Sequence, residues 1–382
     1  MATVKLGDIA IEAKSSNKGD KTGIRIVGLE HLTPSNVTLS SWSEDTENMF
    51  TKEFSKGDVL FGRRRAYLKK AAVAPFDGIC SGDITVIRAV EDKVDPDLLP
   101  FIIQNDFLFE FAVGKSAGSL SPRVKWTHLK EFAIELPSMP EQSKLAETLW
   151  SINETKNAYK DLINKTDELV KSQFIEMFGE LGKDQKGWGL TTLGECCELN
   201  PKRPRNIDDE LEVSFVPMPA VSEDGKIDCS DVKLYKDVRK GFTYFVENDV
   251  LFAKITPCME NGKGAVAKGL SGGIGSGSTE FHVLRPIEGK SNPYWLYIIT
   301  MIKSFRVGAR KVMTGTGGQL RVPVGYLRDF PISLPPIGLQ NAFEAFVHQS
   351  DKSKFALQEA IKDLDALSKK IIAENLIPAG KE

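Results

Sequence analysis

Two segments of this chain nearly repeat each other: FAIELPSMPEQ at residues 132–142 and FPISLPPIGLQ at residues 330–340. Each starts as a short apolar run typical of a strand, passes through Leu-Pro, and leads into a long polar stretch. A boundary of this kind that occurs twice indicates an internal repeat, which has to be recognised before a fold is assigned.

The correspondence between the two copies extends beyond these boundaries. GDVLF at residues 57–61 matches NDVLF at 248–252, and residues 124–142 align without a gap to residues 322–340. The separation between matched positions grows steadily along the chain, as small loop insertions in a duplicated unit would produce. We therefore infer two copies of one design.

Each Leu-Pro boundary is followed by apolar residues at coiled-coil spacing. In the first copy these are Leu145, Leu149, Ile152, Tyr159, Leu162, Ile163, Leu169, Val170 and Met177. In the second copy they are Phe343, Phe346, Ser350, Leu357, Ala360, Leu364, Leu367 and Ile371. Each pattern predicts a helix of about 40 residues, which is about 60 Å at 1.5 Å per residue.

Signals at the helix ends agree with this prediction. Ser138 and Glu141 have the spacing of a capping box, Gly179 follows the first helix and Pro378 follows the second. A long helix with one narrow apolar stripe must bury that stripe against a partner, so we predict that the two helices pair antiparallel. The alternative is two separate domains, each with a helix folded onto its own body.

The chain is therefore predicted to be α+β, with two similar mixed α/β domains joined by two long antiparallel helices that form a coiled coil with a pseudo-two-fold internal repeat. The predicted parts are globular repeat 1 (1–137), long helix 1 (138–182), globular repeat 2 (183–335) and long helix 2 (336–382). Short helices are expected near 96–112 and 292–308.

Composition narrows the class of protein. Charged residues make up 27% and hydrophobic residues 41%, and the longest apolar run, YWLYIITMI at 294–302, is too short to span a bilayer. The amino terminus lacks the pattern of a secretory signal, so we expect a cytoplasmic protein. Five cysteines without a CxxC pair and four histidines support neither a disulfide framework nor a metal site.

Basic residues concentrate just before each Leu-Pro boundary. Residues 111–130 carry four lysines or arginines and no acidic residue, and residues 303–328 carry six and none. Backbone amides in the glycine and serine runs of these stretches suit phosphates, while arginine and glutamine can read base edges. The candidate DNA-contacting residues are Arg63, Arg64, Arg65, Lys115, Arg123, Lys125, Lys202, Arg203, Arg205, Arg310, Lys311, Gln319 and Arg321. For any one of the basic residues, a solvated surface position is the alternative.

Two segments only partly match enzyme motifs. GGIGSGST at 272–279 has the spacing of a phosphate-binding loop, but Ser278 stands where lysine is required, so we predict a structural glycine turn. NPYW at 292–295 lacks the second proline of the NPPY-type motif of amino-methyltransferases. No grouping of catalytic residues appears, and we predict a non-catalytic chain.

With the repeat and the two long helices in place, the chain resembles the specificity (S) subunits of type I restriction-modification systems over nearly its whole length. The closing segments FAIELPSMPEQ and FPISLPPIGLQ carry the resemblance, together with the opening segments KLGDI and TLGEC. The second boundary departs from the family's usual LPP-x-x-EQ form because Leu339 stands where glutamate is expected. This departure predicts a weaker start for the second helix.

The resemblance implies that each globular repeat is a target-recognition domain reading one half of a split, asymmetric DNA site, and that the helices fix the unread spacer. It also implies assembly with two modification subunits, which methylate adenine with S-adenosylmethionine, and with restriction subunits that use ATP and Mg. Cofactors are then expected on partner subunits and not on this chain. Two alternatives stay open: a DNA-free scaffold with two protein-binding domains on a coiled-coil rod, and a self-contained methyltransferase.

Overall fold

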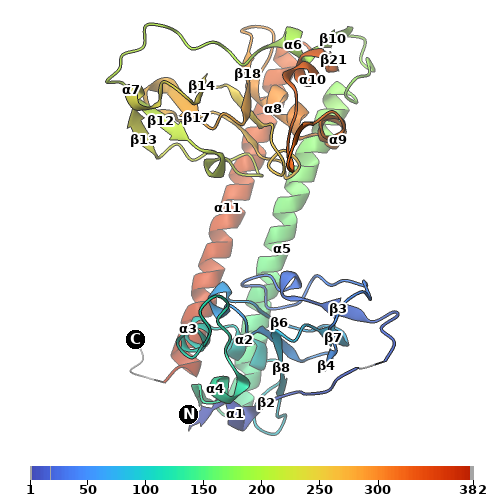
Figure 1. Ribbon diagram of the computed structural model, residues 1–382, viewed down its shortest axis with the longest axis vertical. Coiled ribbons are helices and arrows are strands. Elements are labelled where there is room, and N and C mark those ends of the chain that lie inside the picture. Colours follow the sequence, from blue (N-terminus) through green and yellow to red (C-terminus); the bar gives the residue numbers. More distant parts are fainter. Residues whose placement is uncertain (1, 18, 379–382) are drawn as a thin grey trace. The chain divides into compact units, whose positions relative to one another are not determined.

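The computed structural model describes residues 2–17 and 19–378 (Figure 1). Contacts between residues divide the chain into two compact units. Unit 1 comprises Met1–Asp161 and Leu357–Glu382, and unit 2 comprises Leu162–Ala356. Each unit therefore contains one of the predicted globular repeats together with part of each predicted long helix.

Unit 1 contains three small sheets, with strand orders β2-β8-β5-β6, β3-β7-β4 and β1-β9. Its strands are β1 (Ala2–Lys5), β2 (Ala10–Glu12), β3 (Arg25–Val27), β4 (Lys52–Phe54), β5 (Val59–Gly62), β6 (Ala71–Val73), β7 (Gly78–Cys80), β8 (Ile84–Ala89) and β9 (Ala133–Leu136). Its short helices are α1 (Leu6–Ile9), η1 (Leu29–His31), η2 (Ala66–Leu68), α2 (Leu99–Ile103), α3 (Asp106–Gly114) and α4 (Trp126–Leu129).

Unit 2 repeats this topology. The sheet β11-β18-β15-β16 corresponds to β2-β8-β5-β6, and β10-β21 corresponds to β1-β9. The sheet β13-β12-β17-β14 adds an edge strand, and β19-β20 is an additional hairpin. The strands are β10 (Leu190–Thr192), β11 (Cys197–Leu199), β12 (Glu212–Val216), β13 (Val232–Leu234), β14 (Thr243–Val246), β15 (Val250–Ala253), β16 (Gly264–Val266), β17 (Ile274–Gly277), β18 (Phe281–Pro286), β19 (Thr314–Thr316), β20 (Gln319–Arg321) and β21 (Pro331–Ser333). The short helices are α6 (Leu193–Cys196), η3 (Met218–Ala220), α7 (Tyr235–Val238), η4 (Ser271–Gly273), α8 (Pro293–Met301), α9 (Lys303–Lys311) and α10 (Val324–Asp329).

The repeated motif VLF forms the central strand of each unit. In β5, Val59 and Phe61 face one buried cluster together with residues of α2 and α3, whereas Leu60 faces a second cluster. Successive side chains of a strand point to opposite faces, and both faces are covered here, so the strand is a continuous apolar run. Strand β15 divides its side chains between two clusters in the same way.

The aspartate that precedes VLF in each copy is buried and forms an ion pair with an arginine. Asp58 is 2% exposed and accepts hydrogen bonds of 2.6 Å from both Nε and Nη2 of Arg88. Asp249 is 0% exposed and is bound by Arg285 in the same bidentate way, at 2.8 and 2.7 Å. Each pair ties the turn before the central strand to the neighbouring strand. The repeated aspartate is therefore a structural residue in both units.

The glutamine that ends each quoted boundary segment is a buried link between the long helix and the globular part. Gln340 Nε2 donates to the carbonyl oxygens of Pro335 (2.8 Å) and Lys290 (3.0 Å), and its Oε1 accepts from the amide of Asn292 (2.8 Å). Gln142 donates to its own Leu-Pro carbonyl and accepts from a backbone amide just before α2. The LPxxxxQ spacing is thus explained by hydrogen bonding at the helix start.

The two long helices run in opposite directions within each unit. They are α5 (Met139–Phe178) and α11 (Ile337–Leu376), each of 40 residues. In unit 1, Leu149 near the start of α5 shares a buried cluster with Leu376 at the end of α11. In unit 2, Phe174 near the end of α5 and Phe343 near the start of α11 have ring centroids 5.5 Å apart. The alternative of a separate helix on each body is therefore wrong. Residues 379–382 of the predicted second helix segment lie outside the described residues.

The predicted apolar stripe of the two long helices is confirmed only in part. Leu162, Leu169 and Leu367 were predicted to be buried, but they are 48%, 52% and 46% exposed. Lys156, in contrast, is only 8% exposed. A strict seven-residue pattern assumes one partner along the whole helix. Here each helix packs against both the other helix and a globular repeat, so the buried arc changes along its length.

Lysine–aspartate pairs, in which the lysine is largely buried and the aspartate is partly exposed, join the two helices. In unit 1, Lys156 of α5 is paired with Asp365 of α11. In unit 2, Lys354 of α11 is paired with Asp167 of α5 at 2.7 Å and with Asp351 at 2.9 Å. Burial acts to lower the pKa of Lys354, but its two carboxylate partners raise it overall. The interhelical pairs occupy matching positions in the two copies and can define the register of the helices.

The helix starts explain why Leu339 replaces a glutamate. At the first helix, Glu141 Oε2 accepts from the backbone amide of Ser138 (3.0 Å) and from its hydroxyl (2.8 Å), so the glutamate half of the predicted capping box is present. At the second helix the position equivalent to Ser138 is Pro336, which has no backbone N–H to donate. A glutamate at position 339 would therefore lack this partner.

Among the described residues, no helix has both the length and the apolar character needed to cross a membrane. The short helices predicted near 96–112 and 292–308 are confirmed as α2 with α3 and as α8 with α9.

Candidate nucleic-acid interface

In unit 2, three segments meet where the central strand β15 ends. The amide of Lys254 donates to the carbonyl of Glu280 (2.9 Å), and the amide of Val322 donates to the carbonyl of Lys254 (2.9 Å). The amide of Thr256 donates to the carbonyl of Leu320 (3.0 Å). The segment after β15, the turn before β18 and the strand β20 are thus joined by backbone hydrogen bonds. We call this arrangement the unit 2 junction.

An ion pair closes the unit 2 junction. Arg321 Nε donates to Glu280 Oε2 at 2.9 Å, Nη2 donates to Oε1 at 2.8 Å, and Nη1 donates to the carbonyl of Gln319 at 3.2 Å. The guanidinium group of Arg321 lowers the pKa of Glu280, so this carboxylate stays charged. Burial lowers the pKa of the neighbouring Lys254.

The matching residues of unit 1 form the same arrangement, which we call the unit 1 junction. The amide of Arg63 donates to the carbonyl of Asp83 (3.0 Å), and the amide of Val124 donates to the carbonyl of Arg63 (3.0 Å). Arg123 Nε donates to Asp83 Oδ1 at 2.7 Å and lowers the pKa of that carboxyl group. Arg64 lies 3.4 Å from Asp83 and donates to the hydroxyl of Ser121.

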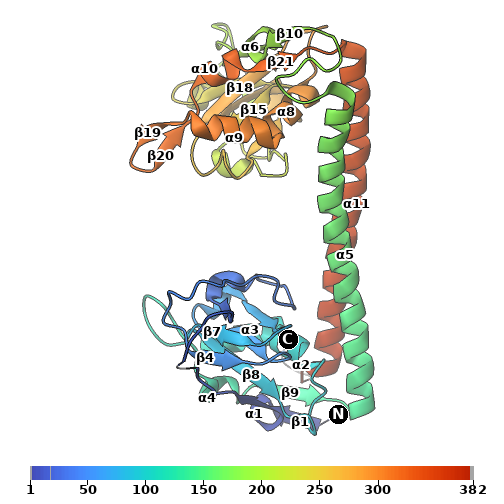
Figure 2. The same cartoon turned by 90° about the vertical axis from the view of Figure 1, so that its right-hand side faces the viewer.

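The unit 2 junction carries a hairpin that sequence reasoning missed. Strands β19 and β20 pair with Thr316 opposite Gln319, and Gly317 and Gly318 between them have φ values of 62° and 76°. Positive φ at both central residues is typical of a type I′ turn, and Gly-Gly flanked by short runs is a hairpin signal. Apart from the half-buried Arg321, the strand residues are exposed, and Figure 2 shows the hairpin projecting from unit 2.

The structure brings some of the predicted DNA-contacting residues together at the two junctions. The junctions contain Arg63, Arg64, Arg65, Arg123, Gln319 and Arg321. Arg310 and Lys311 are exposed in the last turn of α9, directly before the hairpin. Lys115 and Lys125 are exposed on either side of the unit 1 loop. Their contact with DNA stays a prediction for all of these residues.

The cluster Lys202, Arg203 and Arg205 lies in the loop between β11 and β12. Arg203 donates to the carbonyl of Phe242 (3.2 Å), and its guanidinium group lies 5.5 Å from the ring of Tyr235. Lys202 and Arg205 are exposed. Arg203 thus has an intramolecular packing role, while the other two remain available for contact with a ligand.

The segments that resembled enzyme motifs are structural. Asn292 of NPYW is the N-cap of α8, where its side chain accepts from the amides of Tyr294 and Trp295. In GGIGSGST, Gly272 and Gly273 form a turn with positive φ, as predicted, and the following residues enter strand β17. A side chain at Gly275 would collide with the ring of Phe245.

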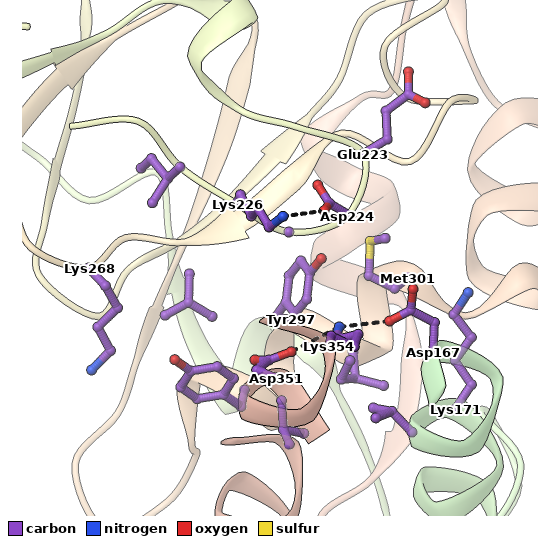
Figure 3. A pocket seen from close by; sticks show the side chains of 17 residues that line it. Asp167, Lys171, Glu223, Asp224, Lys226, Lys268, Tyr297, Met301, Asp351 and Lys354 are labelled. Carbon is purple, nitrogen blue, oxygen red and sulfur yellow. Dashed lines mark hydrogen bonds and ion pairs between the residues drawn. The ribbon is translucent and has the colours of Figure 1, made fainter. Parts of the chain in front are cut away.

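A cavity of about 430 Å³ lies in unit 2, lined by α8, by parts of both long helices and by the loop around Asp224 (Figure 3). Two ion pairs lie among its lining residues: Lys354 lies 2.7 Å from Asp167, and Lys226 lies 3.1 Å from Asp224. A smaller cavity of about 200 Å³ occupies the corresponding place in unit 1. Within residues 2–17 and 19–378, no cluster of His, Cys, Asp and Glu side chains has the arrangement of a metal site.

The fold and the two junctions define a class of protein: a duplicated α+β chain that presents one related basic surface in each unit and has two long antiparallel helices. The family model for the type I restriction modification DNA specificity domain matches residues 1–166 and 185–364. Because these matches cover most of the chain, it belongs to this family, and the resemblance inferred from the boundary motifs is confirmed.

Relatives with assigned names agree with this family. The chain is 39% identical over 221 residues to the type I restriction enzyme EcoEI specificity subunit of Escherichia coli, a match that spans 54% of this chain and 36% of that protein. It is 41% identical over 182 residues to the EcoAI specificity subunit of Escherichia coli, spanning 44% of this chain and 30% of that protein. The matched stretch thus spans about a third of each relative.

Solved structures share the fold. A chain from a structural study of complex assembly and conformational transition in a type I R-M system has a TM-score of 0.57 at 19% identity, covering 98% of this chain and 97% of that one. The type I restriction-modification S subunit from M. genitalium has a TM-score of 0.52 at 12% identity, covering 99% and 96%. These likenesses confirm the predicted fold class.

Proposed function

We propose that this chain is the DNA sequence-specificity subunit of a type I restriction-modification complex. Each unit reads one half of a bipartite, asymmetric DNA site. The observation that carries the proposal is that the same junction occurs in both units, while the exposed residues around it differ. A shared framework with different exposed side chains suits two related surfaces that read different bases.

The difference between the two surfaces is concentrated in the loops. In unit 2 the β19–β20 hairpin presents Gln319 beside Arg310 and Lys311. In unit 1 the equivalent loop makes a single bridge between Ala117 and Arg123 and presents Leu120, which is 92% exposed. Glutamine can pair with adenine in the major groove, whereas leucine offers apolar contact. Two different half-sites are therefore expected.

The long helices supply the spacer between the half-sites in this proposal. Both are continuous over 40 residues and pass through both units. Half-sites on one face of a duplex lie about 34–36 Å apart for each helical turn. A continuous helix is a semi-rigid spacer, whereas a glycine- and serine-rich linker of the same length is flexible.

The proposed partners are double-stranded DNA, two modification subunits and the restriction subunits. In this assembly the modification subunits bind S-adenosylmethionine, and the restriction subunits bind ATP and Mg. The internal repeat supports two copies of one partner, because each long helix carries an exposed leucine at the matching position, Leu169 at 52% and Leu367 at 46%. Methylation by the purified chain alone, measured with labelled S-adenosylmethionine and DNA, would contradict this division of roles.

DNA affinity measured against salt concentration tests the proposal. The slope of log K against log salt is expected to be steep, and the double variant Arg310→Ala with Lys311→Ala is expected to reduce it by about 2, because each lost phosphate contact removes about 0.9. Lys362→Ala is the matched control, since this exposed lysine of α11 pairs with Glu359 and belongs to neither junction. An affinity of wild type that does not depend on salt would favour the DNA-free scaffold.

Methylome sequencing of a host that expresses the chain with its modification subunits would identify the site. A split motif with two unlike halves and a fixed spacer is the expected result. A continuous or palindromic motif would contradict the assignment of one half-site to each unit.

A further inference from the structure

Each junction contains an ion pair between an arginine of the loop and a carboxylate before strand β8 or β18. We propose that Asp83 and Glu280 are positioning residues that set the base preference of their own half-sites without touching DNA. Each acts through its arginine partner, Arg123 or Arg321, which belongs to the loop that presents side chains to the bases. This inference rests on the proposed function.

Glu280 is well placed to hold the hairpin of unit 2. It lies in the turn before β18, and its backbone amide donates to the hydroxyl of Ser278 (3.2 Å). The backbone amide of Ser278 in turn donates to the carbonyl of Val216 in the other sheet (3.1 Å). The hairpin itself is mostly exposed, so its orientation depends on ties at its base. The bidentate pair between Arg321 and Glu280 is the charged tie among them.

Unit 1 contains the same tie with a different acid. The amide of Asp83 is bound by the hydroxyl of Ser81 at 3.2 Å, which matches the bond between Glu280 and Ser278. Arg123 donates from Nε and Nη2 to the two carboxylate oxygens at 2.7 and 3.3 Å. The serine, the carboxylate and the arginine are thus retained in both copies, although the loops that they hold differ in sequence and shape. If these residues hold the loops in place, their retention in both copies is explained. If they contacted two unlike sets of bases, they would be expected to differ between the copies.

The geometry of the pairs also argues against direct contact of these arginines with DNA. An arginine reads guanine through two parallel N–H donors, and in unit 2 the fork formed by Nε and Nη2 of Arg321 is occupied by Glu280. A phosphate that approached Arg321 would meet the carboxylate of Glu280 with its like charge. The exposed Arg310 and Lys311, for which no ion pair is found among the described residues, are better placed to bind phosphates.

The test removes each carboxylate charge while it keeps the shape of the side chain. The full chain, together with its modification subunits, selects from a library of duplexes with randomised base pairs, and the bound fraction is sequenced. Glu280→Gln is expected to reduce base preference in one half-site about tenfold and to leave the other unchanged, because a charge-assisted hydrogen bond is lost. Asp83→Asn is expected to do the reverse, so each variant is the control for the other.

The opposite mechanism gives an opposite result. If Arg321 contacts DNA and Glu280 merely neutralises it, Glu280→Gln frees a positive charge, so binding tightens and base preference is kept. That outcome overturns the proposal. The charge swap Glu280→Arg with Arg321→Glu is expected to restore the preference to within about threefold of wild type, because the pair re-forms with reversed polarity.

Two further outcomes separate this inference from the proposed function. A swap variant that melts at the wild-type temperature but shows no recovery of preference means that Arg321 itself is required, which overturns the positioning role. A wild-type chain that selects no sequence from the library overturns the proposed function instead. Glu280→Gln is nearly isosteric, and a thermal melt of this variant beside wild type separates a loss of preference from unfolding.

Discussion

Replacing Gln340 with alanine is expected to destabilise unit 2 by about 3 kcal/mol. This side chain is 0% exposed and makes hydrogen bonds of 2.8, 3.0 and 2.8 Å to the backbone at Pro335, Lys290 and Asn292. Each hydrogen bond contributes about 1 kcal/mol net, and alanine would leave these backbone groups buried without partners. The same change at Gln142 is expected to cost about 2 kcal/mol, since within residues 2–17 and 19–378 that side chain makes two such bonds.

Hydrogen exchange measured by mass spectrometry is the suitable assay, because a chain with two units need not unfold in a single transition. For Gln340→Ala, amides at the start of α8 are expected to exchange roughly a hundredfold faster, which corresponds to about 3 kcal/mol. Gln349→Ala is the matched control, since it is the same substitution at an exposed position of α11. An acceleration below tenfold, or one equal to the effect of Gln142→Ala in unit 1, would refute this account of the repeated glutamine.

Two further predictions concern buried charge. Asp365→Asn is expected to destabilise unit 1 by about 3 kcal/mol, because it leaves the 8% exposed Lys156 without its carboxylate, whereas Asp167→Asn should cost less because its lysine partner keeps Asp351. Equal losses in the free energy of unfolding for the two variants, measured by denaturant titration, would contradict this difference between the two lysines. Burial lowers the pKa of His282 below its ordinary 6.5, so the folded state binds this proton less readily than the unfolded state. The stability of unit 2 should therefore fall as the pH drops below 6.5, by up to about 1.4 kcal/mol per pH unit. An H282Q variant that retains this slope would show that another group is responsible.

Several features of this protein are fixed by patterns that lie close together in the sequence. The duplicated boundary segments predict two similar bodies, and the long stretches with apolar residues at intervals of three and four predict helices close to the observed 40 residues. Local chemistry also predicts the bond between Ser138 and Glu141 at the start of the first helix, because both partners lie within one helical turn. The basic loops before each boundary can also be recognised, because their lysines and arginines lie close together in the sequence.

The partners of individual charged side chains are decided only by the tertiary structure. Arg123 and Arg321 are indistinguishable in sequence from free cations, yet each is paired with a carboxylate about 40 residues earlier in the chain. Lys156 is buried and paired with a carboxylate that α11 brings to it, while Leu162, on the apolar face, remains 48% exposed. Periodicity identifies which face of a helix is apolar, but which part of that face is covered depends on segments that meet only after the whole chain has folded.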